Sequence, residues 1–575
     1  MIGQDTTVKL TGADALAEAI GATGVKHVFG IPGQRILPLF DTLSARAGIA
    51  VVLSRHEQGA SFMADAYARR AGFGVCVSTS GPGATNMVTG AAASYMDSVP
   101  MLVVTAQAAT TEFGRYGIQE GTGIGRTPDI VAMFAATAKW AGRPMSVEEV
   151  GPMCAEAIAI AFDGRPGPVH LDVPSDLLLE PLADLPERQA APASRPVPSQ
   201  PPPCDPGQLA EAAALLVEAE WPLVLVGNGA ARSGAMPAVM DLARRIEAPV
   251  ACTLMAKGHV DEYDPLVLGP VGLFGSYAAN RALHECADVV LALGVGFSYL
   301  TSSAWPSTLD RLRLVRVDID PRELTNNYQP SVSLLADVGE AVRGLLGRTS
   351  ARLPEKPGST VVKELQAANP PPDLPANGAV HPGAVHPVDA IDAINEFVTP
   401  TTTVVADVGQ NGYWSERYVR NRGNGRFIIN GGLGAMGHGV AGAVGASLAS
   451  GREDPDPVIC ITGDGGFLMT GLEVSTAVEQ GVPVVWVIFN NGSLGTQKRW
   501  FAEHERPEVA CNLPPTRFAQ LAESLGASGY DADSIGGLRA ALAAATAQAG
   551  PAVIDLTIDP APAPKMFFWE QVATG

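Results

Sequence analysis

Oxygen-bearing side chains follow two apolar runs in the last third of the chain. Gly463-Asp464-Gly465 comes directly after the run PVICIT, and Asn490-Asn491 comes directly after the run VVWVIF. If both runs are neighbouring parallel strands, an Asp and an Asn stand side by side at one edge of the sheet. Carboxylate and amide oxygens suit Mg²⁺, and glycines let a diphosphate approach the backbone. Two unrelated strand-end turns are the alternative, but the paired motifs favour a magnesium and diphosphate site.

The elements that would position these residues recur along the whole chain. Short apolar runs such as KHVFG, VCVSTS and TTVVAD alternate with helical patterns such as EQGASFMADAYARRAG. This alternation predicts parallel sheets that are covered by helices on both faces. The Gly-rich turns follow the carboxyl ends of the strands, where ligands bind in such sheets. The expected fold class is α/β, with doubly wound parallel-sheet domains.

Two Pro-rich stretches interrupt the alternation, at about 190–206 and about 354–387. Pro-rich polar segments form extended, semi-rigid linkers. We therefore expect three domains, at 1–188, 207–350 and 385–565.

The composition narrows the class of function. The 39 Lys and Arg against 59 Asp and Glu give a net charge of −20, with no Lys/Arg-rich run, which argues against nucleic acid and anionic membranes as partners. One local Arg could still bind an anionic substrate. The 7 cysteines include no C-x-x-C pair, which favours reduced thiols over a disulfide or zinc scaffold. Without a signal-peptide pattern or a membrane-length apolar run, we expect a cytoplasmic protein.

The GDG…NN pattern resembles the thiamin diphosphate (ThDP) and magnesium motif of ThDP-dependent enzymes. The wider similarity is closest to the acetolactate synthase (acetohydroxyacid synthase) large-subunit family and covers nearly the whole chain. It includes the stretches RHEQGASFMADAYAR, STSGPGATN, GRPGPVHLDVPSD, DVGQNGYW and NGGLGAMGHG. The resemblance implies a pyrimidine-binding first domain, a central Rossmann-like domain and a diphosphate-binding third domain. It also implies a homodimer or homotetramer in which each site lies between the first domain of one chain and the third domain of another.

By the same resemblance, Glu57 is the activating glutamate that holds a proton at N1′ of the aminopyrimidine. Burial in an apolar pocket would raise the pKa of such a carboxyl into a useful range. On its own, Glu57 could equally be a helix-terminal acid favoured by the helix dipole. Asp464, the Asn491 side chain and the Ser493 carbonyl match the metal ligands. The remaining residues that match cofactor-binding positions are Val408, Gly409, Gln410, Gly434, Met436, Gly463, Gly465, Gly466 and Asn490.

Substrate-pocket positions also carry over, and several depart from the family. Gln119 and Trp500 match residues that line the pocket. Typical relatives have PGGA where this chain has Pro32, then Gly33, Gln34 and Arg35, and Thr496-Gln497 replaces an apolar pair. Because a guanidinium suits a carboxylate, Arg35 could bind a polar acceptor. Arg35 pointing into solvent is the alternative.

The central domain is where a relative that binds FAD would carry its FAD-binding residues. Its turn Val226 to Gly229 lacks the third glycine of a dinucleotide fingerprint. The stretch Gly294 to Leu300 also lacks the Arg and the two acids that FAD-containing relatives carry. These departures disfavour FAD but leave it open.

The resemblance implies decarboxylation of a 2-oxo acid, with pyruvate the expected donor, and carboligation of the resulting enamine to a second carbonyl. The enzyme would then be an acetolactate synthase-like transferase. The main alternative is a non-flavin 2-oxo acid decarboxylase or aldehyde lyase of the same superfamily. A nicotinamide dehydrogenase lacks its G-x-G-x-x-G here. A non-catalytic homologue would be expected to lack Glu57 or Asp464, and both are present.

Overall fold

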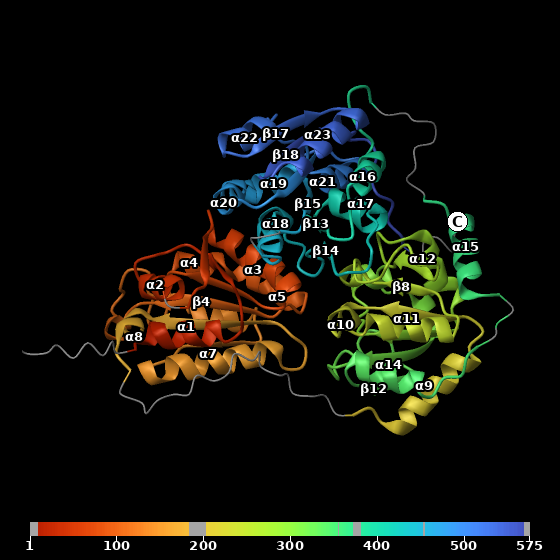
Figure 1. The fold of residues 1–575 in the computed structure, drawn as a ribbon, viewed down its shortest axis with the longest axis horizontal. Helices are drawn as coiled ribbons and strands as arrows, with labels where there is room; N and C mark the ends of the chain where they lie inside the picture. Colours follow the sequence, from red (N-terminus) through yellow and green to blue (C-terminus); the bar gives the residue numbers. More distant parts are fainter. Residues whose placement is uncertain are drawn as a thin grey trace, which may run out of the picture.

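The computed structural model describes residues 10–45, 47–182, 203–352, 354, 356–371, 381–451 and 455–568. Three lobes are visible, each built on one sheet with helices on both faces (Figure 1). Each sheet has six strands, and every strand pairing within the three sheets is parallel. The predicted α/β fold class with three doubly wound sheets is therefore confirmed.

The first sheet has the strand order β2-β1-β3-β4-β6-β5. Its interior strands are buried on both faces, which explains their nearly unbroken apolar sequences. The strands are β1 (His27–Gly30), β2 (Ala50–Leu53), β3 (Gly74–Ser78), β4 (Met101–Gln107), β5 (Trp140–Gly142) and β6 (Pro168–Pro174). The helices are α1 (Gly12–Gly21), α2 (Leu37–Ala45), α3 (Glu57–Ala71), α4 (Pro82–Asn86), α5 (Val88–Met96), α6 (Ile130–Ala135), α7 (Val147–Phe162) and α8 (Ser175–Leu179), with the 3-10 turn η1 (Thr110–Glu112).

The second sheet has the order β12-β11-β10-β7-β8-β9. Its strands are β7 (Pro222–Val226), β8 (Val250–Cys252), β9 (Val267–Pro270), β10 (Val289–Leu293), β11 (Arg313–Asp318) and β12 (Val332–Leu335). Its helices are α9 (Pro206–Glu218), α10 (Asn228–Arg232), α11 (Met236–Arg245), α12 (Tyr277–Arg281), α13 (Tyr299–Ser302), α14 (Val338–Leu346) and α15 (Gly358–Ala368), with the single turns η2 (Leu254–Ala256), η3 (Ala282–Cys286) and η4 (Ser307–Arg311).

The third sheet has the order β14-β13-β15-β16-β18-β17, so the two strands that precede the predicted metal residues, β15 and β16, are neighbours. The strands are β13 (Thr403–Ala406), β14 (Phe427–Ile428), β15 (Val458–Gly463), β16 (Val484–Asn490), β17 (Ser528–Ala532) and β18 (Ala552–Thr557). The helices are α16 (Pro387–Asn395), α17 (Gln410–Tyr418), α18 (His438–Leu448), α19 (Asp464–Thr470), α20 (Val474–Gln480), α21 (Gly495–Glu503), α22 (Phe518–Ser524) and α23 (Ile535–Ala547), with the turn η5 (Gly471–Glu473).

The first and third domains of one chain share a hydrophobic core, which the helices α3 and α18 carry. Gly445 of α18 lies so close to α3 that an added Cβ would be 2.0 Å from the Met63 carbonyl oxygen. Phe62 and Trp486 belong to the same buried cluster. A buried hydrogen bond between His438 Nε2 and Asp65 Oδ1, 2.8 Å apart, joins the two helices further. The start of α3, where Glu57 lies, is thus held firmly against the third domain.

One of the two predicted linkers needs correction. The stretch 354–387 is not extended throughout, because Gly358–Ala368 forms the helix α15. Prolines flank this helix on both sides, whereas the helix itself contains good helix formers and buries Val362 in a cluster of the central domain. Residues 372–380 of this stretch, and the first linker up to residue 202, lie outside the described residues.

All 7 cysteines are free thiols, and all except Cys286 are buried. No helix among the described residues is long and apolar enough to cross a membrane.

Candidate active site

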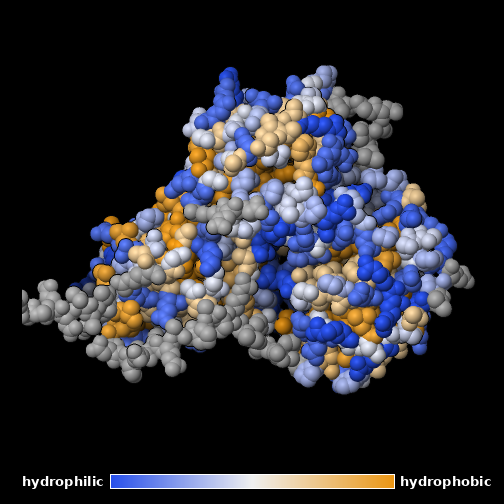
Figure 2. All heavy atoms as spheres, viewed as in Figure 1, coloured by the Kyte–Doolittle hydropathy of each residue, from blue (hydrophilic) through white to orange (hydrophobic). Residues whose placement is uncertain are grey.

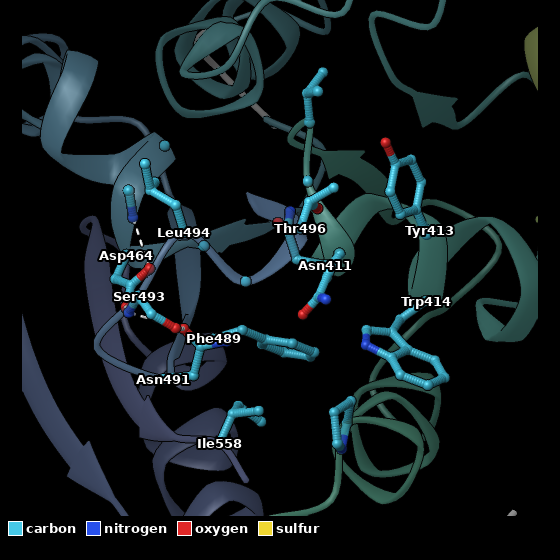
Figure 3. A pocket seen from close by; sticks show the side chains of 18 of the residues that line it. Asn411, Tyr413, Trp414, Asp464, Phe489, Asn491, Ser493, Leu494, Thr496 and Ile558 are labelled. Atoms are coloured by element: carbon cyan, nitrogen blue, oxygen red, sulfur yellow. Dashed lines mark hydrogen bonds between the residues drawn. The ribbon is translucent and has the colours of Figure 1, made fainter. Parts of the chain in front are cut away.

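The predicted diphosphate and metal residues, except Asn490, surround one cavity of about 190 Å³ at the carboxyl ends of the third sheet's strands. Figure 3 shows Asp464, Asn491 and Ser493 together on one wall, with Tyr413 and Trp414 across from them. The sequence-predicted residues that line this cavity are Val408, Gly409, Gln410, Gly434, Met436, Gly463, Asp464, Gly465, Gly466, Asn491, Ser493, Thr496 and Gln497.

The proposed metal ligands converge in space. The Ser493 N–H donates to Asp464 Oδ2 at 3.2 Å and also to Asn491 Oδ1 at 3.1 Å. One carboxylate oxygen and one amide oxygen therefore meet at the same backbone group. Burial raises the pKa of Asp464, and several backbone N–H groups oppose this rise by donating to its carboxylate. A divalent cation would stabilise the ionised carboxylate further, so this donor set fits Mg²⁺.

Bare backbone makes room in the cavity. An added Cβ on Gly465 would be 2.6 Å from Leu494 Cδ2 and 3.4 Å from Met436 Cε, so the Met436 side chain reaches the GDG turn. Gly434, in the loop before α18, has φ of +72°, which favours glycine. The cavity wall therefore combines glycine backbone with apolar and polar side chains, and the glycines leave backbone that a diphosphate can approach.

Asp407, at the end of β13, organises this site and was missed by the sequence reasoning. Its buried carboxylate accepts hydrogen bonds from the N–H groups of Gly437 and Gly439, at 3.0 and 2.9 Å, and from Thr462 Oγ1 at 3.2 Å. Burial raises the pKa of Asp407, while the two glycine N–H groups act to lower it. Asp407 thereby ties the Met436 loop to the strands. The one sequence signal for Asp407 is its position directly before Val408, which was predicted to bind the cofactor.

Other lining residues were also not anticipated. Asn411 donates from Nδ2 to the Asp407 carbonyl at 2.8 Å and lies at the start of α17. The ring of Tyr413 stacks on Phe274 of the central domain with centroids 3.5 Å apart. The full set of additional lining residues is Pro387, Asn411, Tyr413, Trp414, Phe489, Leu494, Gly495, Ile558, Asp559 and Pro562.

Asn490 is not brought into the cavity. Its side chain donates to Asp555 Oδ1 at 2.8 Å, and its own Oδ1 accepts from the Gly492 N–H at 3.3 Å. Asn490 thus helps to form the turn. Its predicted place among the cofactor-binding residues has no support in this geometry, because the side chain faces β18.

Glu57 is the first residue of α3 and lies at the carboxyl edge of the first sheet. Its Oε2 accepts a hydrogen bond from Asn86 Nδ2 at 2.9 Å. Glu57 does not line the cavity of its own chain. The two halves of the predicted site, the carboxylate and the diphosphate cavity, are therefore separate within one chain.

The remaining substrate-pocket candidates lie mainly in the first domain. Gly33 packs on Thr79, with an added Cβ only 2.4 Å from Thr79 Cβ. Gln119 has φ of +60°, and its side chain accepts from Ser80 Oγ at 3.3 Å. Gln34, which precedes Arg35, is exposed and lies in the turn before α2.

Arg35 neither points into solvent nor presents an unpaired charge. Its Nη2 lies 2.7 Å from Glu112 Oε2 and donates to the Ile118 carbonyl at 3.1 Å. Both contacts are on the loop that carries Gln119. Ile118 itself is 79% exposed, an unusual exposure for an isoleucine next to a candidate pocket residue.

Trp500 lies on α21 and remains 49% exposed, stacked on His504 with ring centroids 4.3 Å apart. It does not line the cavity, although Thr496 and Gln497 of the same helix do.

The strand ends of the central sheet are packed with the chain's own groups. An added Cβ on Gly227 would be 2.0 Å from the Gly294 carbonyl oxygen. The Arg316 guanidinium lies over the buried ring of Phe297, 4.9 Å from its centroid, and donates to the Val295 carbonyl. That FAD is disfavoured but still open stays a prediction.

Sequence comparisons agree with this geometry. Residues 10–126, 209–345 and 407–556 match, respectively, the N-terminal TPP binding domain, the central domain and the C-terminal TPP binding domain of thiamine pyrophosphate enzymes. The chain is 36% identical to a probable acetolactate synthase large subunit of Methanocaldococcus jannaschii, over 96% of this chain and 93% of that protein. It is 35% identical to the acetolactate synthase large subunit of Parasynechococcus marenigrum, over 96% and 88%. It is 31% identical to the acetolactate synthase isozyme 2 large subunit of Escherichia coli, over 96% of each. The chain therefore belongs to the acetolactate synthase large-subunit family of thiamin diphosphate-dependent enzymes.

Proposed function

We propose that this enzyme uses ThDP and Mg²⁺ to decarboxylate a 2-oxo acid, with pyruvate as the first candidate, and transfers the remaining unit to a second carbonyl. The observation that supports this proposal best is the convergence of Asp464 and Asn491 on the Ser493 N–H beside a cavity that is partly lined by glycines. Such oxygen donors suit Mg²⁺, and Mg²⁺ suits a diphosphate.

Each part of the cofactor would meet a different part of the chain. Asp464, the Asn491 side chain and the Ser493 carbonyl would hold the metal. The aminopyrimidine would rest on the backbone of Gly434 and Met436. The turn of Val408, Gly409 and Gln410, together with Gly463, Gly465 and Gly466, would face the diphosphate.

The chain's own residues bind, orient and handle protons around that cofactor. Bound ThDP supplies a nucleophilic carbon and an electron sink for the pair released with CO₂. Glu57 would hold the proton at N1′ of the aminopyrimidine, and Asn86 fixes the direction of its carboxylate. Met436, Leu494 and Phe489 add apolar surface to the cavity and limit the access of water to it.

We further propose that two copies of the chain complete each site. Glu57 and Gln119 do not line the cavity of their own chain, so a second copy would have to supply them. Exposed apolar side chains lie beside the relevant elements of both halves, and Figure 2 shows apolar surface where the first and third domains adjoin. Such surface is typical of protein interfaces. The exposed apolar side chains include Tyr95, Met96, Tyr116, Ile118 and Ile124 in the first domain and Leu433, Leu468, Met469 and Leu472 in the third.

Calorimetric titration of the apo-protein with ThDP, with and without Mg²⁺, tests the cofactors. We expect saturable binding that requires the metal. Absence of ThDP binding at any Mg²⁺ concentration would refute the proposal.

Product analysis then tests the reaction. With pyruvate alone, and then with pyruvate and a second oxo acid or aldehyde, we expect CO₂ together with a hydroxy-oxo product. Release of acetaldehyde without ligation would favour the decarboxylase alternative. The Glu57→Gln variant should bind ThDP and lose about 10²–10⁴-fold in turnover.

A further inference from the structure

Glu473 is a buried acid of the third domain whose carboxylate faces the first domain. Its residue is only 1% exposed, and it ends the turn η5, directly after the helix α19 that begins at Asp464. The Arg55 N–H donates to its Oε1 and Oε2 at 3.0 and 3.1 Å. The His56 N–H donates to Oε1 at 3.2 Å. One side chain of the third domain thus binds two successive backbone groups of the first.

The contact is close as well as polar. An added Cβ on Gly59 would be 2.1 Å from Glu473 Oε1, so α3 approaches the carboxylate as nearly as its backbone allows. Thr476 Oγ1 donates to Oε2 at 2.7 Å. Burial raises the pKa of Glu473, and the hydrogen bonds from Thr476, Arg55 and His56 oppose this rise. A buried carboxylate is tolerated when its oxygens are hydrogen-bonded in this way.

The bound N–H groups immediately precede Glu57. His56 caps α3, because its Nδ1 accepts from the Gln58 N–H at 3.1 Å, and Glu57 is the first helical residue. A negative charge at the start of α3 also interacts favourably with the helix dipole. Rotation of the turn at residues 55–56 would move the Glu57 side chain, and Glu473 opposes that rotation.

We propose that Glu473 is a positioning residue for Glu57, which sets the direction of the activating carboxylate through the backbone of Arg55 and His56. The inference rests on the proposed function of Glu57. If two chains share each site, Glu473 also connects α19, which carries the metal ligand of one site, to the carboxylate that serves the other.

The test compares variants of the full-length protein. Glu473→Ala removes both carboxylate oxygens that accept from the N–H groups of Arg55 and His56. Glu473→Gln retains one acceptor oxygen for the two N–H groups and should rescue much of the loss. Gly59→Ala places a methyl group against Glu473 Oε1 and so pushes the carboxylate away from α3. It is a second way to disrupt the contact if Glu473→Ala does not fold. Glu479→Gln is the matched control, because it breaks the Arg55 Nη2–Glu479 ion pair of 2.7 Å at the same interface without touching the backbone contacts.

The first readout is hydrogen–deuterium exchange in the apo-protein. The backbone amides of Arg55 and His56, followed in peptides that cover residues 53–59, should exchange at least about tenfold faster in Glu473→Ala and Gly59→Ala. They should exchange at the wild-type rate in Glu479→Gln. An unchanged rate in both disruptive variants would overturn the proposed contact.

The second readout is the exchange rate of the thiazolium C2 proton of bound ThDP, measured by rapid quenching and NMR. Because a displacement of about 1 Å can cost about 10²-fold, we expect a fall of that order in Glu473→Ala, with ThDP affinity within about threefold of wild type. In the Glu57→Gln background, Glu473→Ala should cause no further fall.

These readouts separate the possible failures. A wild-type C2 exchange rate in folded Glu473→Ala holoenzyme, alongside faster amide exchange and a lower melting temperature, would make Glu473 merely structural and overturn the proposal. A wild-type C2 exchange rate in Glu57→Gln would instead refute the proposed function of Glu57, whereas the amide exchange would still report on the contact itself.

Discussion

The partners of Arg35 predict how this residue affects substrate use. Its guanidinium is bound to Glu112 and to the Ile118 carbonyl, with side-chain exposures of 13% for Arg35 and 41% for Glu112. We therefore expect Arg35 to support the loop of Gln119 rather than to bind an acceptor carboxylate directly. Because Glu112 is well exposed, the ion pair contributes only about 0.2–1 kcal/mol. The bond to the Ile118 carbonyl raises the total effect of Arg35→Ala to about 1–2 kcal/mol, or about 5- to 30-fold in kcat/KM for ligation.

A double-mutant cycle of Arg35→Ala and Glu112→Gln decides between the two roles. If Arg35 supports the loop, each single variant raises the acceptor KM, and the pair shows a coupling of about 0.5–1 kcal/mol. Donor decarboxylation and ThDP affinity should stay close to wild type, since neither residue lines the cofactor cavity. If Arg35 binds the acceptor, Glu112→Gln would free the guanidinium and lower the acceptor KM. That result would refute the reasoning.

Three further predictions concern the cofactor, the pH dependence of stability and the acceptor. Asp464→Ala should weaken Mg²⁺ and ThDP together by at least about 10–100-fold, because loss of supporting groups alone costs that much; calorimetry that finds ThDP affinity retained would contradict it. Burial raises the pKa of Glu416 to about 7, with Arg417 and Lys257 opposing the rise. The folded protein then binds more protons than the unfolded chain between about pH 4.5 and 7, so this group's contribution to stability falls as pH rises through that window. Glu416→Gln should match wild type near pH 5 and exceed it by up to about 3 kcal/mol at pH 8, seen as a higher melting temperature at pH 8 only. Trp500→Leu should admit bulkier acceptors with a selectivity change of about 10–200-fold and little loss of stability, and an unchanged product ratio in competition assays would exclude Trp500 from acceptor choice.

The sequence was sufficient where local pattern and sheet rules act together. Asp464 and Asn491 directly follow neighbouring parallel strands, so their proximity follows from the alternation of strands and helices. Asn490 shows the limit of the same reasoning. Successive side chains of a strand point to opposite faces, and Asn490, one residue before Asn491, therefore reaches Asp555 instead of the cavity.

Long-range polar contacts were not predictable from local patterns. Asp407, Glu473 and the Glu112 partner of Arg35 bind groups that are far from them in sequence, and no spacing rule indicates such pairs. The helix α15 was missed for a different reason. The prolines at its ends suggested a linker, although the segment between them has helix-forming residues and an apolar face.

Mixing two inactive variants tests the shared active site most directly. Glu57→Gln and Asp464→Ala would be co-expressed with different tags, and the mixed oligomer purified through both. If the first domain of one chain and the third domain of another form each site, random assembly gives about a quarter of all sites both wild-type residues. In purified mixed dimers, about half of the sites have both. Turnover of the mixed dimer near half of the wild-type value is the predicted result. A mixed dimer as inactive as either parent would contradict the shared site, because Glu57 and Asp464 would then have to act within one chain.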